Sequence, residues 1–279
     1  MDTVFAKQIL KDHVAFVTGG GTGITGGVAR ALAEAGANVA LVSRSIEHLE
    51  PAAKAINEAR AQGDSPTVRE GADSEKPHIG EAFAVAADVR KPEEVEKAIA
   101  ATIERFGKID IVVNGAAGNF LCTAEELSPN GFGTVVDIDL KGTFNVCRAA
   151  FDELKKNRGQ ILNISATLHY LGTPMQLHVS AAKAGVDALT KNLAVEWGHY
   201  GIRVNAIAPG PIEDTEGMKR LVPEPIKEKL RQRVPLGRFG LIKDIENAAV
   251  FLCSDAASFI NGAIIVVDGG HWLAANRLI

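Results

Sequence analysis

The feature that most constrains the fold is a regular alternation of short apolar runs with helical segments. Seven apolar runs occur, at residues 14–17, 38–42, 82–89, 109–114, 160–165, 203–208 and 263–268. Helical segments are expected between them, at residues 28–35, 45–61, 92–106, 129–156, 181–199 and 244–252. Fully apolar strands alternating with helices are typical of a parallel sheet covered on both faces. The pattern predicts an α/β fold: one domain over residues 1–279, with a Rossmann-like, doubly wound, seven-stranded parallel sheet.

Two segments interrupt this alternation. Residues 63–81 are polar and contain Pro and Gly, at a position where a helix-to-strand loop usually has only ~2–6 residues. We therefore expect a surface loop insertion there. Residues 209–235 leave the carboxyl end of a strand, where open α/β sheets bind their ligands. We expect this second segment to be a substrate lid.

Charge and composition exclude several classes of protein. Lys and Arg total 30 against 34 Asp and Glu, a net charge of −4, so nucleic acid is not expected as a partner. No apolar run approaches ~18 residues, so no membrane insertion is expected. Residues 1–13 lack the features of a secretory signal, and residues 276–279 are not Ser-Lys-Leu, so we expect a cytoplasmic protein, with the peroxisome left open. Cys122, Cys147 and Cys253 match no metal-ligand spacing, and we predict no metal site.

A cluster of glycines separates the first apolar run from the first helix. Such a turn lets the backbone approach a pyrophosphate, whose charge is stabilised by the free N–H groups at the helix N-terminus. After the second apolar run stand Ser43 and Arg44, where NAD-selective proteins place a carboxylate. A planar guanidinium suits a 2′-phosphate, so we predict NADP(H) as the cofactor, with NAD as the alternative.

Five motifs in register resemble the short-chain dehydrogenase/reductase family. They are Thr18-Gly19-x-x-x-Gly23-Ile24, Asp88-Val89, Asn114-Gly115-Ala116-Ala117-Gly118, Lys183 and Ala208-Pro209-Gly210-Pro211-Ile212. The resemblance covers nearly the whole chain. It implies that the cofactor is bound by Gly19, Gly21, Thr22, Gly23, Ile24, Ser43, Arg44, Asp88, Val89, Asn114, Ala116, Lys183, Pro209, Gly210 and Ile212.

Several positions depart from the family pattern. Thr25 replaces the third glycine of the turn, and we expect this to loosen the contact between the first strand and helix. The catalytic tyrosine of the family falls at Val179, its serine at Ala166 and the asparagine of its central helix at Asp139. Without the phenol, the usual proton relay to an alcohol is missing, which disfavours a carbonyl/alcohol dehydrogenase.

One tyrosine-free branch of the family, the peroxisomal-type 2,4-dienoyl-CoA reductases, is similar at residues 116–122, 137–139, 163–168 and 193–212. This resemblance implies NADPH-dependent reduction of a dienoyl-CoA to a 3-enoyl-CoA in the β-oxidation of unsaturated fatty acids. It also implies that Asp139 and Lys183 are catalytic and hold a proton-donating water. Acyl-CoA contacts are expected from Arg90, Asn119, Phe120, Ser128, Asn130 and Arg220.

Family members commonly form tetramers, so a homotetramer is expected through residues 129–156, residues 181–199 and the last strand. Cys147, Val186 and Leu189 would then be partly interfacial.

Two other functions remain open on the sequence. The chain could reduce another enoyl or carbonyl substrate, with Tyr170 or Ser180 as the proton donor. It could also be a catalytically weak family member that binds a nucleotide. Asp139, in turn, could be a buried hydrogen-bonding residue that supports Lys183 without taking part in the chemistry.

Overall fold

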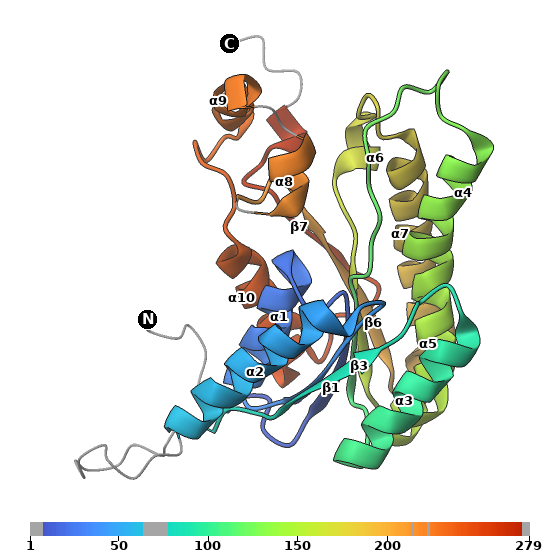
Figure 1. Ribbon diagram of the computed structural model, residues 1–279, viewed down its shortest axis with the longest axis vertical. Helices are drawn as coiled ribbons and strands as arrows, with labels where there is room; N and C mark the ends of the chain where they lie inside the picture. The colour runs from blue at the N-terminus through green and yellow to red at the C-terminus, as the bar shows by residue number, and fades with distance from the viewer. Residues whose placement is uncertain (1–7, 64–77, 214, 222–223, 275–279) are drawn as a thin grey trace.

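A seven-stranded sheet runs through the centre of the protein (Figure 1). The computed structural model describes residues 8–63, 78–213, 215–221 and 224–274. The strands are β1 (Val14–Thr18), β2 (Asn38–Ser43), β3 (Ala82–Ala86), β4 (Ile111–Asn114), β5 (Gln160–Ile164), β6 (Arg203–Pro209) and β7 (Ile264–Val267). They pair in the order β3-β2-β1-β4-β5-β6-β7, all parallel, which confirms the predicted fold class. The order reverses between β1 and β4, and ligands bind at such a reversal.

Helices cover both faces of this sheet. The elements outside the sheet are α1 (Gly23–Glu34), α2 (Ile46–Gly63), α3 (Pro92–Phe106), α4 (Pro129–Val136), η1 (Asp137–Lys141), α5 (Gly142–Asn157), α6 (Leu168–Leu171), α7 (Leu177–Trp197), η2 (Gly198–Tyr200), α8 (Glu216–Leu221), α9 (Glu224–Arg233), α10 (Ile242–Leu252), η3 (Asp255–Ala257) and η4 (Trp272–Ala274). Helices α1, α2 and α10 lie on one face, and α3, α5 and α7 lie on the other (Figure 1).

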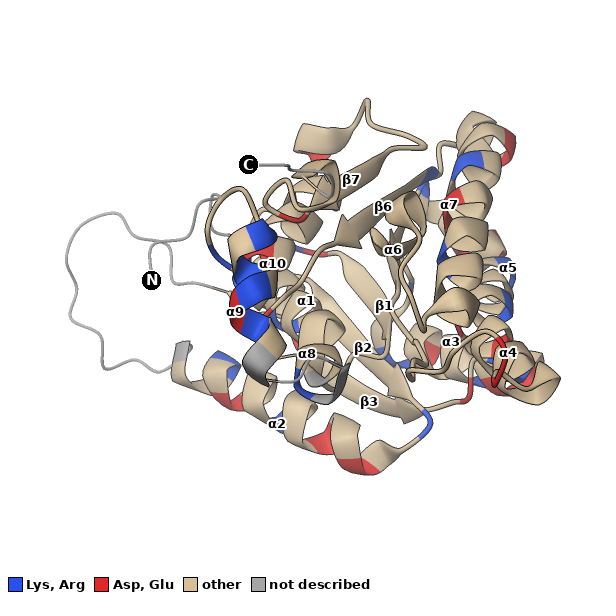
Figure 2. Ribbon diagram, turned by 90° about the horizontal axis from the view of Figure 1, so that it is seen from above, with Lys and Arg blue, Asp and Glu red and all other residues tan. Residues whose placement is uncertain are grey.

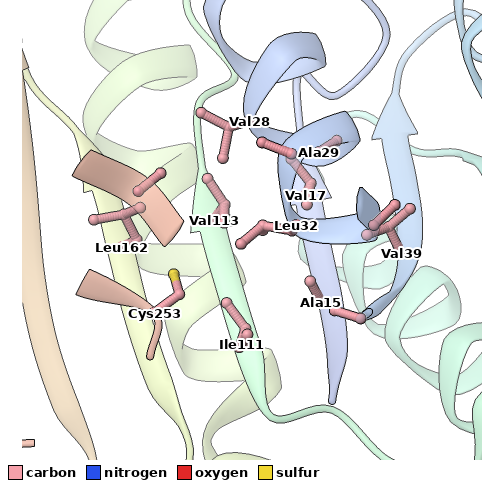
Figure 3. Packing of buried hydrophobic residues seen from close by; sticks show 14 of the residues in the cluster. Ala15, Val17, Val28, Ala29, Leu32, Val39, Ile111, Val113, Leu162 and Cys253 are labelled. Carbon is pink, nitrogen blue, oxygen red and sulfur yellow. The ribbon is translucent and has the colours of Figure 1, made fainter. Parts of the chain in front are cut away.

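The alternation of side chains along each strand produces these two layers. Ala15 and Val17 of β1 pack under α1, whereas Phe16 between them packs on the opposite face. Figure 3 shows Val28 and Leu32 of α1 beside these strand residues, and both are fully buried. Burying one such side chain contributes about 1.5–3 kcal/mol. The sheet is therefore a rigid support for the loops at the carboxyl ends of its strands.

The turn between β1 and α1 is closed by a hydrogen bond from Thr25. Gly19 has a φ of +70°, and a Cβ there would lie 2.7 Å from the carbonyl oxygen of Gly115. Thr25 Oγ1 donates to the carbonyl oxygen of Gly19 over 2.7 Å. A Cβ at position 115 would meet the Thr25 methyl at 1.9 Å, so the threonine fits because residue 115 is glycine. At the position of the missing third glycine, Thr25 thus adds a hydrogen bond within the turn.

The long helix predicted at residues 129–156 contains an irregular turn. Between α4 and α5, residues Asp137–Lys141 form a π-helical turn. Such turns are rare, and they often occur at functional sites. Asp139 lies in the middle of this one and is fully buried.

Two segments interrupt the alternation of strands and helices. Most of the predicted insertion, residues 64–77, lies outside the described residues. The segment 209–235 carries α8 and α9 beyond the end of β6. Of the helices in the described part of the chain, none is long and apolar enough to cross a bilayer.

Candidate active site

A buried ion pair marks the centre of the site. Lys183 of α7 places its Nζ 3.2 Å from Asp139 Oδ2, and the two side chains are 8% and 0% exposed. The same Nζ donates to the carbonyl oxygen of Ile164, the last residue of β5, over 2.8 Å. Two charges in such a place are tolerated because each compensates the other. The structure thus brings together the two residues predicted to be catalytic.

The carboxylate of Asp139 retains a free acceptor position. Its Oδ1 accepts a 2.7 Å hydrogen bond from the backbone N–H of Gly118. Its Oδ2 accepts no hydrogen bond from any described residue, although Lys183 Nζ is 3.2 Å away. A buried oxygen of this kind normally binds a protein donor or an ordered water. The pair therefore offers one seat for a water or a polar ligand atom.

A cavity of about 450 Å³ opens at the carboxyl ends of β1, β2 and β3. Eight of the predicted cofactor residues line it: Gly19, Gly21, Thr22, Ser43, Arg44, Asp88, Val89 and Ala116. Ser45, His48, Ala87, Ala117 and Ile138 also line it, and sequence reasoning missed them. The cavity lies where the strand order reverses, and its glycine turn suits a pyrophosphate.

The exposed end of this cavity is cationic. Arg44 is exposed at the end of β2, beside Ser43 and Ser45. His48 lines the same space from the first turn of α2. The signal that could have found it is its position, four residues after Arg44 at the start of a helix that follows the second strand.

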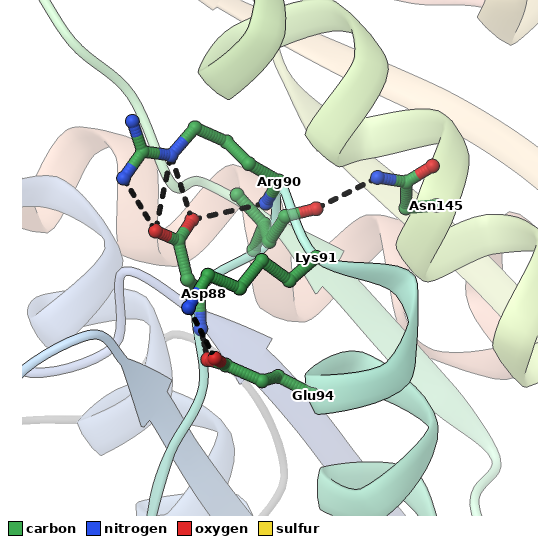
Figure 4. A network of polar contacts seen from close by, with 6 residues as sticks. Asp88, Arg90, Lys91, Glu94 and Asn145 are labelled. Carbon is green, nitrogen blue, oxygen red and sulfur yellow. Dashed lines mark hydrogen bonds and ion pairs between the residues drawn. The ribbon is translucent and has the colours of Figure 1, made fainter.

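Asp88 and Arg90 pair with each other at the side of the cavity (Figure 4). The guanidinium donates through Nε over 2.9 Å to Oδ1 and through Nη2 over 2.5 Å to Oδ2. This hydrogen bonding lowers the pKa of Asp88 below its usual value. The Arg90 side chain is 37% exposed. Arg90, which is predicted to bind the substrate, is thus paired with Asp88, which is predicted to bind the cofactor.

Comparison with known proteins identifies the family of the chain. The family model described as Enoyl-(Acyl carrier protein) reductase matches residues 19–271. A solved structure described as a short chain dehydrogenase from Bacillus anthracis is similar, with a TM-score of 0.78, 41% identity, and coverage of 93% of this chain and 96% of that one. The chain belongs to the short-chain dehydrogenase/reductase family.

Two similar curated proteins carry the name peroxisomal 2,4-dienoyl-CoA reductase [(3E)-enoyl-CoA-producing]. The one from Saccharomyces cerevisiae is 49% identical over 95% of this chain and 86% of its own length. The one from Arabidopsis thaliana is 45% identical over 99% of this chain and 90% of its own length.

The position of the family's catalytic tyrosine is part of an apolar cluster in this short-chain reductase. Val179 is 3% exposed and packs with Val135 and Ala182. One phenol does lie nearby in the sequence, on Tyr170 of α6. Its hydroxyl donates a hydrogen bond to Asp187 over 3.1 Å. Asp187 therefore holds the phenol in a hydrogen bond.

The segment that follows β4 is fastened to the start of α7. Asn119 Nδ2 donates to Gln176 Oε1 over 2.9 Å, and the backbone N–H of Cys122 donates to the carbonyl oxygen of Met175 over 3.0 Å. The ring of Phe120 lies 4.3 Å from that of His178, centroid to centroid. The side chain of Asn119, which is predicted to contact the acyl-CoA, thus already donates a hydrogen bond through Nδ2, while its Oδ1 accepts none from the described residues.

The remaining predicted substrate residues lie at two helices, α4 and α8. Ser128 caps α4, since its Oγ accepts from the N–H of Gly131 over 3.0 Å, and Asn130 is exposed in the first turn of that helix. Arg220 lies in α8, and its side chain is outside the described part of the structure.

Asn114 turns its side chain away from the cavity, because Nδ2 donates to Asn163 Oδ1 over 2.9 Å within the sheet. At the end of β6, Pro209 and Gly210 lie beside β7, and Ile212 is buried. Gly23 and Ile24 begin α1.

The three cysteines differ in their surroundings. Cys147 and Cys253 are buried, and burial raises the pKa of each thiol to about 12. Both thiols therefore stay protonated at neutral pH. Cys122 is half-buried in the segment after β4.

Proposed function

We propose that this short-chain reductase is an NADPH-dependent 2,4-dienoyl-CoA reductase. It would convert a conjugated dienoyl-CoA into a 3-enoyl-CoA in the β-oxidation of unsaturated fatty acids. The observation that carries the proposal is the buried Asp139–Lys183 pair in a site whose tyrosine position holds Val179. The likeness to two proteins with that name supports it.

This reaction needs no phenol. NADPH, when bound, supplies a hydride to the δ carbon of the conjugated thioester. The protein must then stabilise the negative charge that develops towards the thioester oxygen and deliver a proton to the α carbon. A positive charge and a positioned proton donor meet both needs, whereas an alkoxide-protonating acid is unnecessary.

Lys183 and Asp139 meet those needs in different ways. The ammonium of Lys183 is held by Ile164 and Asp139, so its charge is fixed in direction before substrate arrives. It would orient the nicotinamide ribose and favour the enolate. The free position on Asp139 Oδ2, beside the ammonium, would seat the water that gives the proton.

The choice of NADP(H) over NAD(H) rests on Arg44. The end of β2 carries a guanidinium and two serines, and none of these is the carboxylate that would repel a 2′-phosphate. His48 adds a fourth hydrogen-bonding side chain on the same side of the cavity.

The acyl-CoA would lie over the segment 119–122 and beneath residues 209–235. Figure 2 shows Lys and Arg gathered on α9, where Lys227, Lys229, Arg231 and Arg233 follow one another closely. These cations would favour the CoA phosphates on a lid. Arg90 would have to leave Asp88 to reach a phosphate, which its exposed position permits.

The alternative proton donors are less suitable. Burial, reinforced by the charge of Asp187, raises the pKa of the Tyr170 hydroxyl well above its usual value. A phenol with a raised pKa is a poorer acid, and its proton already serves Asp187. Ser180 Oγ is buried without a partner among the described residues, with no base to activate it. A catalytically weak nucleotide-binding protein would not need the Asp139–Lys183 pair.

The remaining proposals concern the assembly of the protein and its cellular compartment. We propose one domain and a homotetramer formed through α4, α5, α7 and β7. Cys147 and Val186 are buried within the single chain, so the expectation that they are partly interfacial is wrong. Phe144 of α5 and Val195 of α7, which are 50% and 82% exposed, are better contacts. Sedimentation tests the tetramer, and cell fractionation separates the cytosol from the peroxisome.

The proposed function is tested by comparing the turnover of different classes of substrate. Purified protein is given NADPH with 2,4-hexadienoyl-CoA, 2,4-decadienoyl-CoA, a simple ketone or a 2-enoyl-CoA, and loss of NADPH absorbance is followed. We expect turnover of the dienoyl thioesters alone, with a 3-enoyl product identified by mass spectrometry and NMR. Absence of dienoyl-CoA turnover at micromolar enzyme would falsify the proposal.

A further inference from the structure

A second buried carboxylate lies one helical turn beyond Lys183. Asp187 follows Lys183 by four residues on α7, so both point to the same side of the helix. The Asp187 side chain is only 8% exposed. The reaction described above gives it no part.

Three donors converge on this carboxylate. Ser165 Oγ donates to Oδ1 over 2.5 Å, while His169 Nε2 lies 2.8 Å and Tyr170 Oη 3.1 Å from Oδ2. An ionised carboxylate can only accept, so Nε2 carries the proton of the His169 ring. With three donors in place, Asp187 is not free to act as a base. The carboxylate instead holds Ser165, His169 and Tyr170 in place.

The anchored groups border the reaction centre. Lys183 binds the carbonyl oxygen of Ile164, and Asp187 binds the hydroxyl of the next residue, Ser165. Helix α7 is therefore fastened to two consecutive residues at the end of β5.

The same carboxylate reaches the C-terminal turn through an aromatic contact. The ring of Tyr170 meets that of Trp272 edge-on, with 5.4 Å between centroids. The backbone N–H of Trp272 donates to Asp268 Oδ2, directly after β7. Leu171 of α6 and Leu273 of η4 are 42% and 72% exposed. Two short elements with exposed apolar side chains are thus joined at the ligand-binding edge of the sheet.

We propose that Asp187 is a positioning residue that holds α6 and, through Tyr170, η4 as one wall of the acyl pocket in register with Lys183. This inference rests on the proposed acyl-CoA substrate. The wall would contact carbons beyond the reacting diene, so its loss should act most strongly on long acyl chains. Asp187 would thereby set chain-length preference, while the proton would still come from the centre at Asp139.

Asp187→Asn tests this, because it keeps the shape and removes the charge. We expect kcat/KM with decadienoyl-CoA to fall by roughly tenfold or more, and that with hexadienoyl-CoA by less, since a misplaced binding wall can cost up to ~10²-fold. The NADPH dissociation constant should stay within about twofold of wild type, because no cofactor contact is lost. Asp152→Asn, on the exposed side of α5, is the matched control.

Two further variants keep the test decisive if Asp187→Asn does not fold. Tyr170→Phe keeps the ring beside Trp272 but removes the hydroxyl that donates to Asp187, so η4 is no longer joined to the carboxylate. The decadienoyl to hexadienoyl ratio should fall by about threefold. His169→Gln, which retains a donor, should behave closer to wild type than His169→Leu. An unchanged ratio in Tyr170→Phe, or an equal fall for both substrates, would overturn the proposal.

A readout without substrate separates this inference from the proposed function. Trp197 and Trp272 are the two tryptophans of the chain, so a Trp197→Phe background leaves Trp272 as the sole tryptophan, whose emission is excited selectively over that of tyrosine at the red edge of the absorption band. In that background, Asp187→Asn or Tyr170→Phe should shift the Trp272 emission to longer wavelength as its surroundings open to water. An unchanged emission would overturn the coupling even if dienoyl-CoA is the substrate. A shifted emission with no dienoyl-CoA turnover in wild type would reject the proposed function alone.

Discussion

At the reaction end of the site the charges are buried and paired, whereas at the adenosine end they are exposed to solvent. Lys183 and Asp139 are 8% and 0% exposed, but the Arg90 side chain is 37% exposed and Arg44 projects from the end of β2. A buried charge that loses its partner has no water to replace it, while an exposed charge does. Changes at the two ends should therefore differ in size and in salt dependence.

The largest effect is expected from Lys183→Met, which leaves Asp139 buried without a counter-charge. Breaking a buried pair from one side costs about 3–5 kcal/mol of unfolding free energy. Replacing both residues, as Lys183→Met with Asp139→Leu, should recover at least half of that loss. Urea unfolding followed by circular dichroism measures both. Additive losses in the double variant would mean that the two charges do not compensate each other.

Asp139→Ala should reduce kcat for dienoyl-CoA by roughly 10²-fold or more, because the seat for the proton-donating water is lost. The NADPH dissociation constant, measured by fluorescence titration, should hardly change. Asp137→Ala, two residues earlier in the same π-helical turn but 43% exposed, serves as the control. Full turnover in Asp139→Ala would assign Asp139 a purely supporting role for Lys183.

Arg44→Ala should raise the KM for NADPH by about tenfold, as expected when a charge-assisted hydrogen bond at an exposed site is lost. The KM for NADH should change far less, because NADH has no 2′-phosphate. Lys54→Ala, on an exposed part of α2, controls for net charge. An equal rise in the KM for NADPH and for NADH would show that Arg44 does not bind the 2′-phosphate.

Arg90→Met should have the smallest effect on stability, roughly 0.2–1 kcal/mol at neutral pH and less at high salt. Arg90 lowers the pKa of Asp88, so the stabilisation is complete above the ordinary Asp pKa of 3.8 and disappears as the pH falls through the lower folded value. The difference in unfolding free energy between wild type and Arg90→Met should therefore narrow below about pH 4. A difference that grows on acidification would contradict the pairing seen in Figure 4.

Much of the fold could be predicted because its signals are local. The alternation of Ala15, Phe16 and Val17 between faces follows from the geometry of a strand, and the glycine turn follows from the shape of a phosphate. Arg44 could be placed at the cavity because it directly follows a strand. These inferences needed only neighbours in the sequence.

Other parts of the site could not be predicted, because they join residues far apart in the chain. Thr25 is accommodated by Gly115, and the Lys183 ammonium lies beside Asp139. The π-helical turn around Asp139 has no mark in the sequence, since one extra residue in a helical turn changes no periodicity that can be seen. The role of Asp187 has no local mark in the sequence, because its three partners lie 17 to 22 positions away.

The sequence by itself determined the sheet, the glycine turn and the kinds of charge available at the ends of the strands. Family motifs in register also singled out Asp139 and Lys183. Only the tertiary structure decided which charges are buried together and which face water. Packing sets both distance and solvent exposure, and these determine whether a carboxylate seats a water, as Asp139 can, or anchors a wall, as Asp187 does.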